Sequence, residues 1–153
     1  MLGTWPGLGI IWLNNVDRET GQEKYLQHAT NVARFIMNHP RLPEDKIPYW
    51  DFDAPGIPNE LRDASAGALM ASAFIELKVI SQNNVFLLPK TVEDFVIAEY
   101  LAEPGTNCNF ILKHSVGNNP GKAEVDVPLT YADYYYVEAL VRYKRDILKE
   151  KLH

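Results

Sequence analysis

Residues 64–77, ASAGALMASAFIEL, form the segment that most constrains how this chain can fold. Small residues recur through it, and between them lie the larger apolar side chains of Leu69, Met70, Phe74 and Leu77. A helix that is apolar on nearly every side is buried, and a thin helix lets its neighbours approach closely. We therefore expect a helix that begins near Asp63 and occupies an inner position. Asp63 or Ser65 can cap its first turn.

The stretch before this helix, residues 40–62, holds five of the ten prolines in the chain. Proline removes a backbone donor and interrupts helices, so an irregular crossover is predicted here. The same stretch carries apolar side chains, namely Ile47, Tyr49, Trp50, Phe52 and Ile57. Flexible linkers are usually polar, so we expect this loop to be ordered and packed against the helices.

Apolar periodicity and turn residues predict the remaining elements. The predicted segments are a helix over 21–38, a short helix over 91–100, strands over 109–116 and 123–129, and a helix over 131–152. The polar turn GNNPGK, 117–122, joins the two strands. Helices joined by long aromatic loops indicate a mainly α chain arranged as an array or toroid of helical hairpins.

Composition narrows the classes of partner. The net charge of −5 and the absence of a basic stripe argue against nucleic acid. No apolar run approaches the roughly 20 residues of a membrane span, so no membrane partner is expected. Cys108 is the single cysteine, which excludes an internal disulfide, and no His/Cys cluster indicates zinc. One cysteine suits either redox environment, so the compartment stays open between cytoplasm and periplasm.

Asp51 and Asp53 allow two interpretations. In an extended segment they would face the same side about 6–7 Å apart, near the separation of paired glycosidase carboxylates. Hydrogen bonding within the loop explains the same pattern. The neighbouring aromatic residues Tyr49, Trp50 and Phe52 could stack on a sugar ring or fix the loop to the helices.

Polar groups at three further places could bind a ligand or serve only the fold. Arg62 and Asp63 could form an anion site or a helix cap. Lys122 follows a glycine-bearing turn and could hold sulfate or carboxylate, or simply be solvated. Ser115 stands beside His114, but neighbouring strand residues point to opposite faces and no nucleophile-elbow motif is present, which disfavours a Ser/His hydrolase.

Long runs of this sequence together resemble the C-terminal part of the unsaturated glucuronyl hydrolases, glycoside hydrolase family 88. The matching runs are RETGQEKYLQHA (18–29), IPYWDFDAPGIPNELRDASAGALMASAFIEL (47–77), EYLAEPGTN (99–107) and LKHSVGNNPGKAEVDVPLTYADYYYVEALVRYK (112–144). The resemblance implies a partial (α/α)6 toroid with about five helices and a short β-hairpin. Residues 1–153 would then be a single C-terminal fragment, with an atypical start at 1–17.

The family resemblance also implies a reaction. Its members, which are bacterial, remove a 4,5-unsaturated uronic acid from the non-reducing end of polysaccharide-lyase products. An aspartic acid protonates the C4=C5 double bond, water adds at C5, and the resulting hemiketal opens to expel the aglycone. No metal or cofactor is implied, and the partner is an unsaturated oligosaccharide.

This chain departs from the family pattern in two ways. The acid/base aspartates of the family lie in motifs that are absent here, and none of the aspartates in the 47–77 run matches them. The family also has a Trp-x-Arg-Gly-Gln-x-Trp run, where this chain reads TWPGLGIIW. Trp5 matches the first tryptophan of that run, whereas Trp12 falls one position out of register. We therefore expect no catalytic residue and no activity from this chain alone.

The resemblance still assigns substrate-side positions. It places the 47–62 loop at the mouth of the toroid and the 115–122 segment beside the aglycone sugar. The candidate binding residues are Trp5, Trp50, Asp51, Arg62, Asp63, Ser115 and Lys122. Two alternatives stay open: a stand-alone helical carbohydrate-binding or interaction module, and a non-functional gene remnant. An exposed inner surface would favour self-association.

Overall fold

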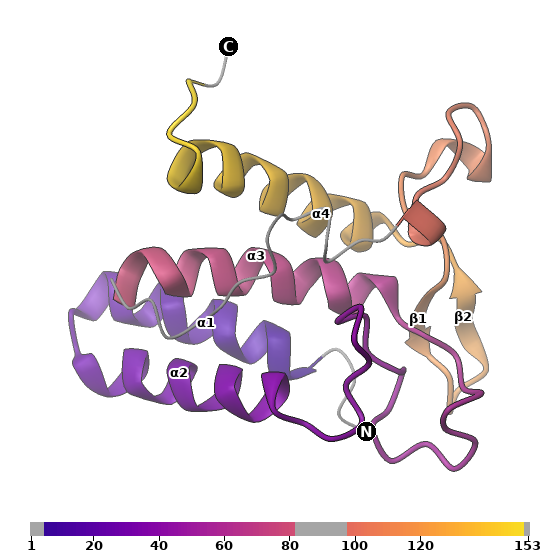
Figure 1. Ribbon diagram of the computed structural model, residues 1–153, viewed down its shortest axis with the longest axis horizontal. Coiled ribbons are helices and arrows are strands. Elements are labelled where there is room, and N and C mark those ends of the chain that lie inside the picture. The colour runs from indigo at the N-terminus through magenta and orange to yellow at the C-terminus, as the bar shows by residue number, and fades with distance from the viewer. Residues whose placement is uncertain (1–4, 82–97, 152–153) are drawn as a thin grey trace.

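The computed structural model describes residues 5–81 and 98–151. Four α-helices are the main secondary structure of this part: α1 (Trp5–Thr20), α2 (Glu23–Met37), α3 (Ala64–Ser81) and α4 (Thr130–Arg142). Figure 1 shows that α1, α3 and α4 run in the same direction, whereas α2 runs in the opposite one. The helix α3 packs against each of the other three. The mainly helical fold expected from the sequence is therefore confirmed.

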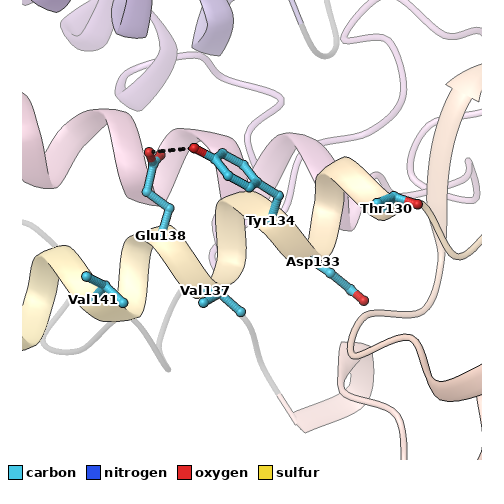
Figure 2. A pocket seen from close by; sticks show the side chains of 6 residues that line it. All are labelled: Thr130, Asp133, Tyr134, Val137, Glu138 and Val141. Atoms are coloured by element: carbon cyan, nitrogen blue, oxygen red, sulfur yellow. Dashed lines mark hydrogen bonds between the residues drawn. The ribbon is translucent and has the colours of Figure 1, made fainter. Parts of the chain in front are cut away.

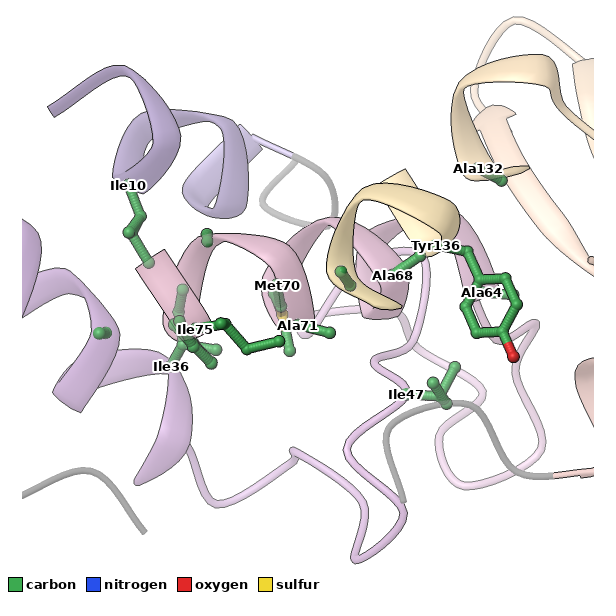
Figure 3. Packing of buried hydrophobic residues seen from close by; sticks show 14 of the residues in the cluster. Ile10, Ile36, Ile47, Ala64, Ala68, Met70, Ala71, Ile75, Ala132 and Tyr136 are labelled. Atoms are coloured by element: carbon green, nitrogen blue, oxygen red, sulfur yellow. The ribbon is translucent and has the colours of Figure 1, made fainter. Parts of the chain in front are cut away.

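The helix α3 is the core of this arrangement, as its composition predicts. It is buried from Ala64 through Ile75, and Leu77 is buried as well. Figure 3 shows side chains from the neighbouring helices meeting it, among them Ile10 of α1, Ile36 of α2 and Tyr136 of α4. Among the described helices α3 alone is long and apolar enough to cross a bilayer, and 72% of it is buried inside the protein. Its neighbours therefore account for its apolar surface.

The helix α1 covers residues 5–20, for which the sequence predicts only an atypical start. Ile10, Leu13, Asn14 and Asp17 are its buried side chains, and they follow one helical stripe. Gly7 allows close approach to α3, because a Cβ there would lie 2.1 Å from Leu69 Cδ2. The helix ends at Gly21, whose φ of 62° suits glycine and whose amide bonds to the Asp17 carbonyl at 2.7 Å.

A polar cluster joins α1, α3 and α4 near their C-terminal ends, and we call it the Glu76 cluster. Glu76 Oε1 accepts a hydrogen bond from Arg18 at 2.8 Å, and Glu76 Oε2 lies 3.2 Å from an Arg142 nitrogen. Asn14 donates to Glu76 Oε2 at 3.4 Å, and Arg142 also pairs with Glu138 at 3.3 Å. The Glu76 and Arg142 side chains are only 11% and 13% exposed. These partly buried ion pairs therefore hold three helices in register.

Two strands form the hairpin at the opposite end. They are β1 (Ser115–Asn118) and β2 (Ala123–Val127), paired antiparallel with an irregularity between Ser115 and Val116. Both strands are shorter than predicted. The stretch 107–109 forms a short 3-10 turn with positive φ, so it cannot extend β1. The amides of Ile111 and Leu112 bond to the Asp133 carboxylate, each at 2.9 Å, instead of to a strand.

Two predicted helices differ from the structure. The helix expected over 91–100 lies mostly outside the described residues, which include only the 3-10 turn Ala98–Tyr100. The helix expected over 131–152 stops being α-helical at Arg142 and continues as a π-helix over Tyr143–Ile147. There the Leu148 amide bonds to the Tyr143 carbonyl five residues back, at 3.0 Å. Lys149, with φ of 58°, then breaks the helical backbone.

Candidate functional site

Most of the residues singled out from the sequence lie at one end of the molecule. The proline-rich loop, residues 40–62, and the hairpin, residues 115–127, both lie beside the N-terminal ends of α3 and α4 (Figure 1). We call this end the mouth. The directions of the helices bring these segments together. The antiparallel helix α2 ends where α3 begins, and α4 runs parallel to α3, so it begins at the same end.

Arg62 is committed to the proline-rich loop. Its Nε donates to the Ile47 carbonyl at 2.8 Å, and its terminal nitrogen pairs with the Asp45 carboxylate. The guanidinium also lies 5.1 Å from the centre of the Tyr49 ring, a cation–π distance. Both charged side chains of the pair are less than one quarter exposed. Arg62 therefore braces the loop from within, and its guanidinium already has an anionic partner.

Trp50 and Asp51 also make contacts inside this loop. Trp50 Nε1 donates to Glu60 Oε2 at 2.9 Å. Asp51 is buried, and its Oδ1 accepts a hydrogen bond from the Asp53 amide at 2.9 Å. Asp53 itself is exposed. The two aspartates therefore form a loop turn and do not face one another as a carboxylate pair, so the hydrogen-bonding interpretation fits the structure.

Asp63 lies where the loop, the hairpin and α3 meet. It is 1% exposed, and its Oδ1 accepts hydrogen bonds from the Ser65 amide at 3.0 Å and the Ser65 hydroxyl at 2.5 Å. The Val116 amide of β1 donates to the same oxygen at 3.2 Å. Burial raises the pKa of the Asp63 carboxyl, although these hydrogen bonds act in the opposite direction. Asp63 is therefore the cap of α3, as the sequence predicts, and also a contact to the hairpin.

Ser115 is completely buried at the start of β1. Its hydroxyl has no hydrogen-bond partner within the described structure, and neither does Asp63 Oδ2. Lys122 is exposed on the turn of the hairpin, where its amide donates to the Asn119 carbonyl at 3.0 Å. His114 Nδ1 and Asp126 Oδ1 lie 2.7 Å apart across the base of the hairpin. The hairpin thus offers a lysine to solvent and buries its serine.

Trp5 is the first residue of α1, and the structure does not describe its side chain. Within the described part of the chain, no three or more His, Cys, Asp or Glu side chains gather as metal ligands would.

A shallow groove of about 540 Å³ runs along the outer side of α4. Figure 2 shows its lining residues, which are Thr130, Asp133, Tyr134, Val137, Glu138 and Val141. Three of them are exposed apolar or aromatic side chains: Tyr134 at 60%, Val137 at 44% and Val141 at 36%. The Tyr134 hydroxyl lies 3.4 Å from Glu138 Oε1. Among the described residues this groove is mainly an exposed apolar helix face, which begins at Thr130 and follows α4 away from the mouth.

Comparisons with known proteins agree on one family. Over 134 residues the chain is 42% identical to an unsaturated glucuronyl hydrolase of Formosa agariphila, and over 146 residues it is 30% identical to one of Bacillus sp. GL1. These matches cover 86% and 91% of this chain but 34% and 38% of the relatives. The chain therefore spans about a third of the length of the curated relatives it matches. No family model matches it.

Solved structures give the same result for the fold. The chain superposes on an unsaturated glucuronyl hydrolase specific for heparin with a TM-score of 0.80 and 42% identity, covering 94% of this chain and 39% of the other. The enzyme of Bacillus sp. GL1 gives a TM-score of 0.74 at 27% identity, again covering 39% of its chain. These neighbours are (α/α)6 toroid enzymes. The described helices therefore correspond to part of such a ring.

The sequence does not reveal the features that depend on tertiary contacts. The buried stripe of α1 was visible as apolar residues three apart, Ile10 and Leu13, but Gly7 and Gly9 obscured it. The link between Asp63 and Val116 joins residues 53 positions apart, and no local pattern signals it.

Proposed function

We propose that this chain, a relative of the unsaturated glucuronyl hydrolases, forms part of a hydrolase that removes a 4,5-unsaturated uronic acid from the non-reducing end of polysaccharide-lyase products. One observation carries the proposal: the chain is 42% identical over 134 residues to a curated enzyme of this kind. Because it spans about a third of such relatives, the activity is proposed for a completed ring and not for these 153 residues alone.

In this proposal the chemical step uses groups outside the chain. An aspartic acid protonates the C4=C5 double bond of the uronic acid, and water adds at C5. The hemiketal then opens, which breaks the bond to the aglycone. The residues of this chain bind and orient the sugar, and we assign no acid or base role to any of them.

The geometry divides the candidate binding residues into two groups. Lys122 is exposed on the hairpin and can meet a sulfate or carboxylate of the substrate directly. Arg62, Asp63 and Ser115 are largely enclosed, so they shape the mouth without reaching far into solvent. Trp50 and Asp51 belong to the second group as well, because Trp50 Nε1 and Asp51 Oδ1 make hydrogen bonds within the loop. Trp5 remains a candidate for contact with the uronate.

The relatives differ in the glycan they are named for. The structure at 42% identity is of an enzyme specific for heparin, and a relative from Streptococcus pneumoniae at 26% identity is a chondroitin disaccharide hydrolase. Since the heparin-specific enzyme is more similar in sequence, we propose an unsaturated heparin-type disaccharide as the first substrate to test. Chondroitin-type disaccharides provide the comparison.

The experiment joins this chain to the remaining part of the Formosa agariphila relative in one polypeptide. Hydration of the double bond removes its ultraviolet absorbance, so turnover is followed directly. We expect turnover by the chimera and none by the 153-residue chain or by the remaining part of the relative alone. A folded chimera that leaves every unsaturated disaccharide intact would contradict the proposed function. Turnover by the 153 residues alone would contradict the division of roles.

A second candidate function is supported by the exposed apolar face of α4. A stand-alone binding or interaction module would keep a stable monomeric fold and bind unsaturated disaccharides in a saturable titration. A gene remnant would instead associate through its uncovered surfaces or aggregate. Size-exclusion chromatography combined with that titration separates the two.

A further inference from the structure

We propose that Asp63 is a positioning residue that sets the placement of the hairpin at the mouth. One oxygen of its carboxyl group, Oδ1, accepts from Ser65 in α3 and from the Val116 amide in β1. The first contact caps a helix, which many aspartates do. The second contact joins that cap to a segment 53 residues away, and a helix cap does not require it.

Backbone hydrogen bonds on both sides of the carboxyl group complete the junction. The Asp63 amide donates to the Pro48 carbonyl of the proline-rich loop at 2.9 Å. The Ala64 amide donates to the carbonyl of His114, immediately before β1, at 3.2 Å. Residues 63 and 64 therefore contact the loop, the hairpin and α3 at once, so a shift of Asp63 would move both substrate-side segments.

The hairpin depends on this junction because its own pairing is weak. It is a two-stranded sheet of four and five residues, with a break in register between Ser115 and Val116. Isolated two-stranded hairpins are marginally stable in water. Ser115 and Val116 are buried where the hairpin meets α3, whereas Gly117, Asn118, Ala123 and Glu124 are exposed. The buried end of β1, where Asp63 binds it, therefore fixes the whole hairpin.

The functional consequence rests on the proposed function. Lys122 stands on the turn of this hairpin, so the position of its ammonium group relative to a bound sugar follows the placement of β1. In the chimera, loosening the Asp63 contact is expected to raise KM severalfold and to leave kcat nearly unchanged, because the reacting groups lie elsewhere.

Two substitutions separate the cap from the link to the hairpin. Asp63→Ser keeps a good helix cap, but its shorter side chain cannot also reach the Val116 amide. Asp63→Asn keeps a carbonyl oxygen at the same distance along the side chain. We expect amide hydrogen exchange at Val116 to be about tenfold or more faster in Asp63→Ser, and close to the parent rate in Asp63→Asn. Asp63→Gly, which also supports a helix start, repeats the test if the serine variant does not fold.

Glu76→Gln is the matched control, because it removes a partly buried carboxylate near the other end of the same helix. It is expected to speed amide exchange in α1 and α4. Once any change in the overall free energy of unfolding is allowed for, the exchange rate of Val116 is expected to stay the same. Equal loss of protection at Val116 in the Glu76 and Asp63 variants would overturn the proposal, as would unchanged Val116 protection in Asp63→Ser. The exchange measurement uses this chain without any sugar, so a failure of the proposed activity would not affect its outcome.

Discussion

Asp63 is a carboxyl group held almost entirely away from water at the first turn of a buried helix. Burial disfavours its charged form, and the hydrogen bonds from Ser65 and Val116 offset this only in part, so its pKa is raised above 3.8. A group with a raised folded-state pKa stabilises the fold fully below its unfolded pKa. That contribution is lost as the pH rises through the folded-state pKa.

Asp63→Asn removes this titration while keeping the carbonyl oxygen. The stability of the parent chain relative to Asp63→Asn is therefore expected to fall as the pH rises above about 4, until the Asp63 carboxyl is fully ionised. Thermal unfolding of both proteins at several pH values checks this. The series begins at about pH 3.5, just below the ordinary pKa of Asp, and extends to about pH 8. A difference in Tm that stays constant over the series would contradict the burial of a titrating group here.

At the residue scale, the sequence predicts contacts within one helix turn better than contacts that depend on the shape of a loop. The cap at Asp63 follows from its place before an apolar helix, and the structure shows that cap. The spacing of Asp51 and Asp53 could not distinguish a facing pair from a turn, because the answer depends on whether the loop is extended. The Asp51–Asp53 hydrogen bond shows that it is a turn.

The contact between α1 and α3 depends on one glycine. A methyl group added to Gly7 would overlap the Leu69 side chain, which is 1% exposed and has little room to move, whereas nothing lies within 4 Å of a Cβ at Gly9. Gly7→Ala is expected to destabilise the chain by about 1–3 kcal/mol through overpacking. Gly9→Ala is expected to stabilise it by about 0.5–1 kcal/mol, since alanine favours helix. Urea unfolding of the pair measures both, and a stabilising Gly7→Ala would contradict the close packing.

The Glu76 cluster holds the C-terminal ends of three helices. Glu76→Ala leaves Arg18, Arg142 and Asn14 without their shared acceptor. We therefore expect the free energy of unfolding to fall by about 3 kcal/mol. This is the lower end of the range for broken buried ion pairs, because the Arg18 side chain is half exposed.

Glu19→Ala provides the control for that substitution. The Glu19 side chain is 77% exposed and lies 3.9 Å from the same Arg18, so its removal is expected to change stability by less than about 0.5 kcal/mol. Chemical denaturation gives both values. Similar effects from Glu76→Ala and Glu19→Ala would show that the cluster does not link the helices.

At the element scale, composition predicts α3 and leaves the boundaries of other elements open. An apolar helix rich in alanine can only be internal, and that prediction is confirmed. The hairpin and the final helix were predicted too long, because side-chain contacts from Asp133 and a change to π-helical hydrogen bonding end these elements. Such endings depend on tertiary partners, which periodicity does not reveal.

The outer face of α4 belongs to the scale of the whole molecule, because none of the other described elements packs against its exposed side chains. Tyr134, Val137 and Val141 form an exposed apolar stripe there. We expect the isolated chain to self-associate with rising concentration, and Val137→Glu with Val141→Glu to shift it toward monomer without loss of stability.

Light scattering during size-exclusion chromatography measures that shift. Val79→Glu is the control, since Val79 is 43% exposed at the other end of the core helix and lies outside the stripe. Self-association that is insensitive to the α4 variants, or equally reduced by Val79→Glu, would contradict a role for this face.

At the scale of the whole molecule, the resemblance predicts the ring architecture and the comparisons support it. The residue pattern alone predicts an array or toroid of helical hairpins and does not distinguish between the two. Ring closure depends on how successive hairpins turn relative to one another, and that angle arises from contacts spread over many helices.

The two ends of α3 carry separate sets of contacts. Contacts that keep the helices in register gather around Glu76, while the proline-rich loop and the hairpin, the segments proposed to meet the sugar, gather around Asp63 at the other end of the same helix. Insertions or exchanges in residues 40–62 or 115–127 can therefore alter the surface offered to a glycan without disturbing the distant ion pairs. A protein arranged in this way can change its sugar preference while the packing of its helices stays the same.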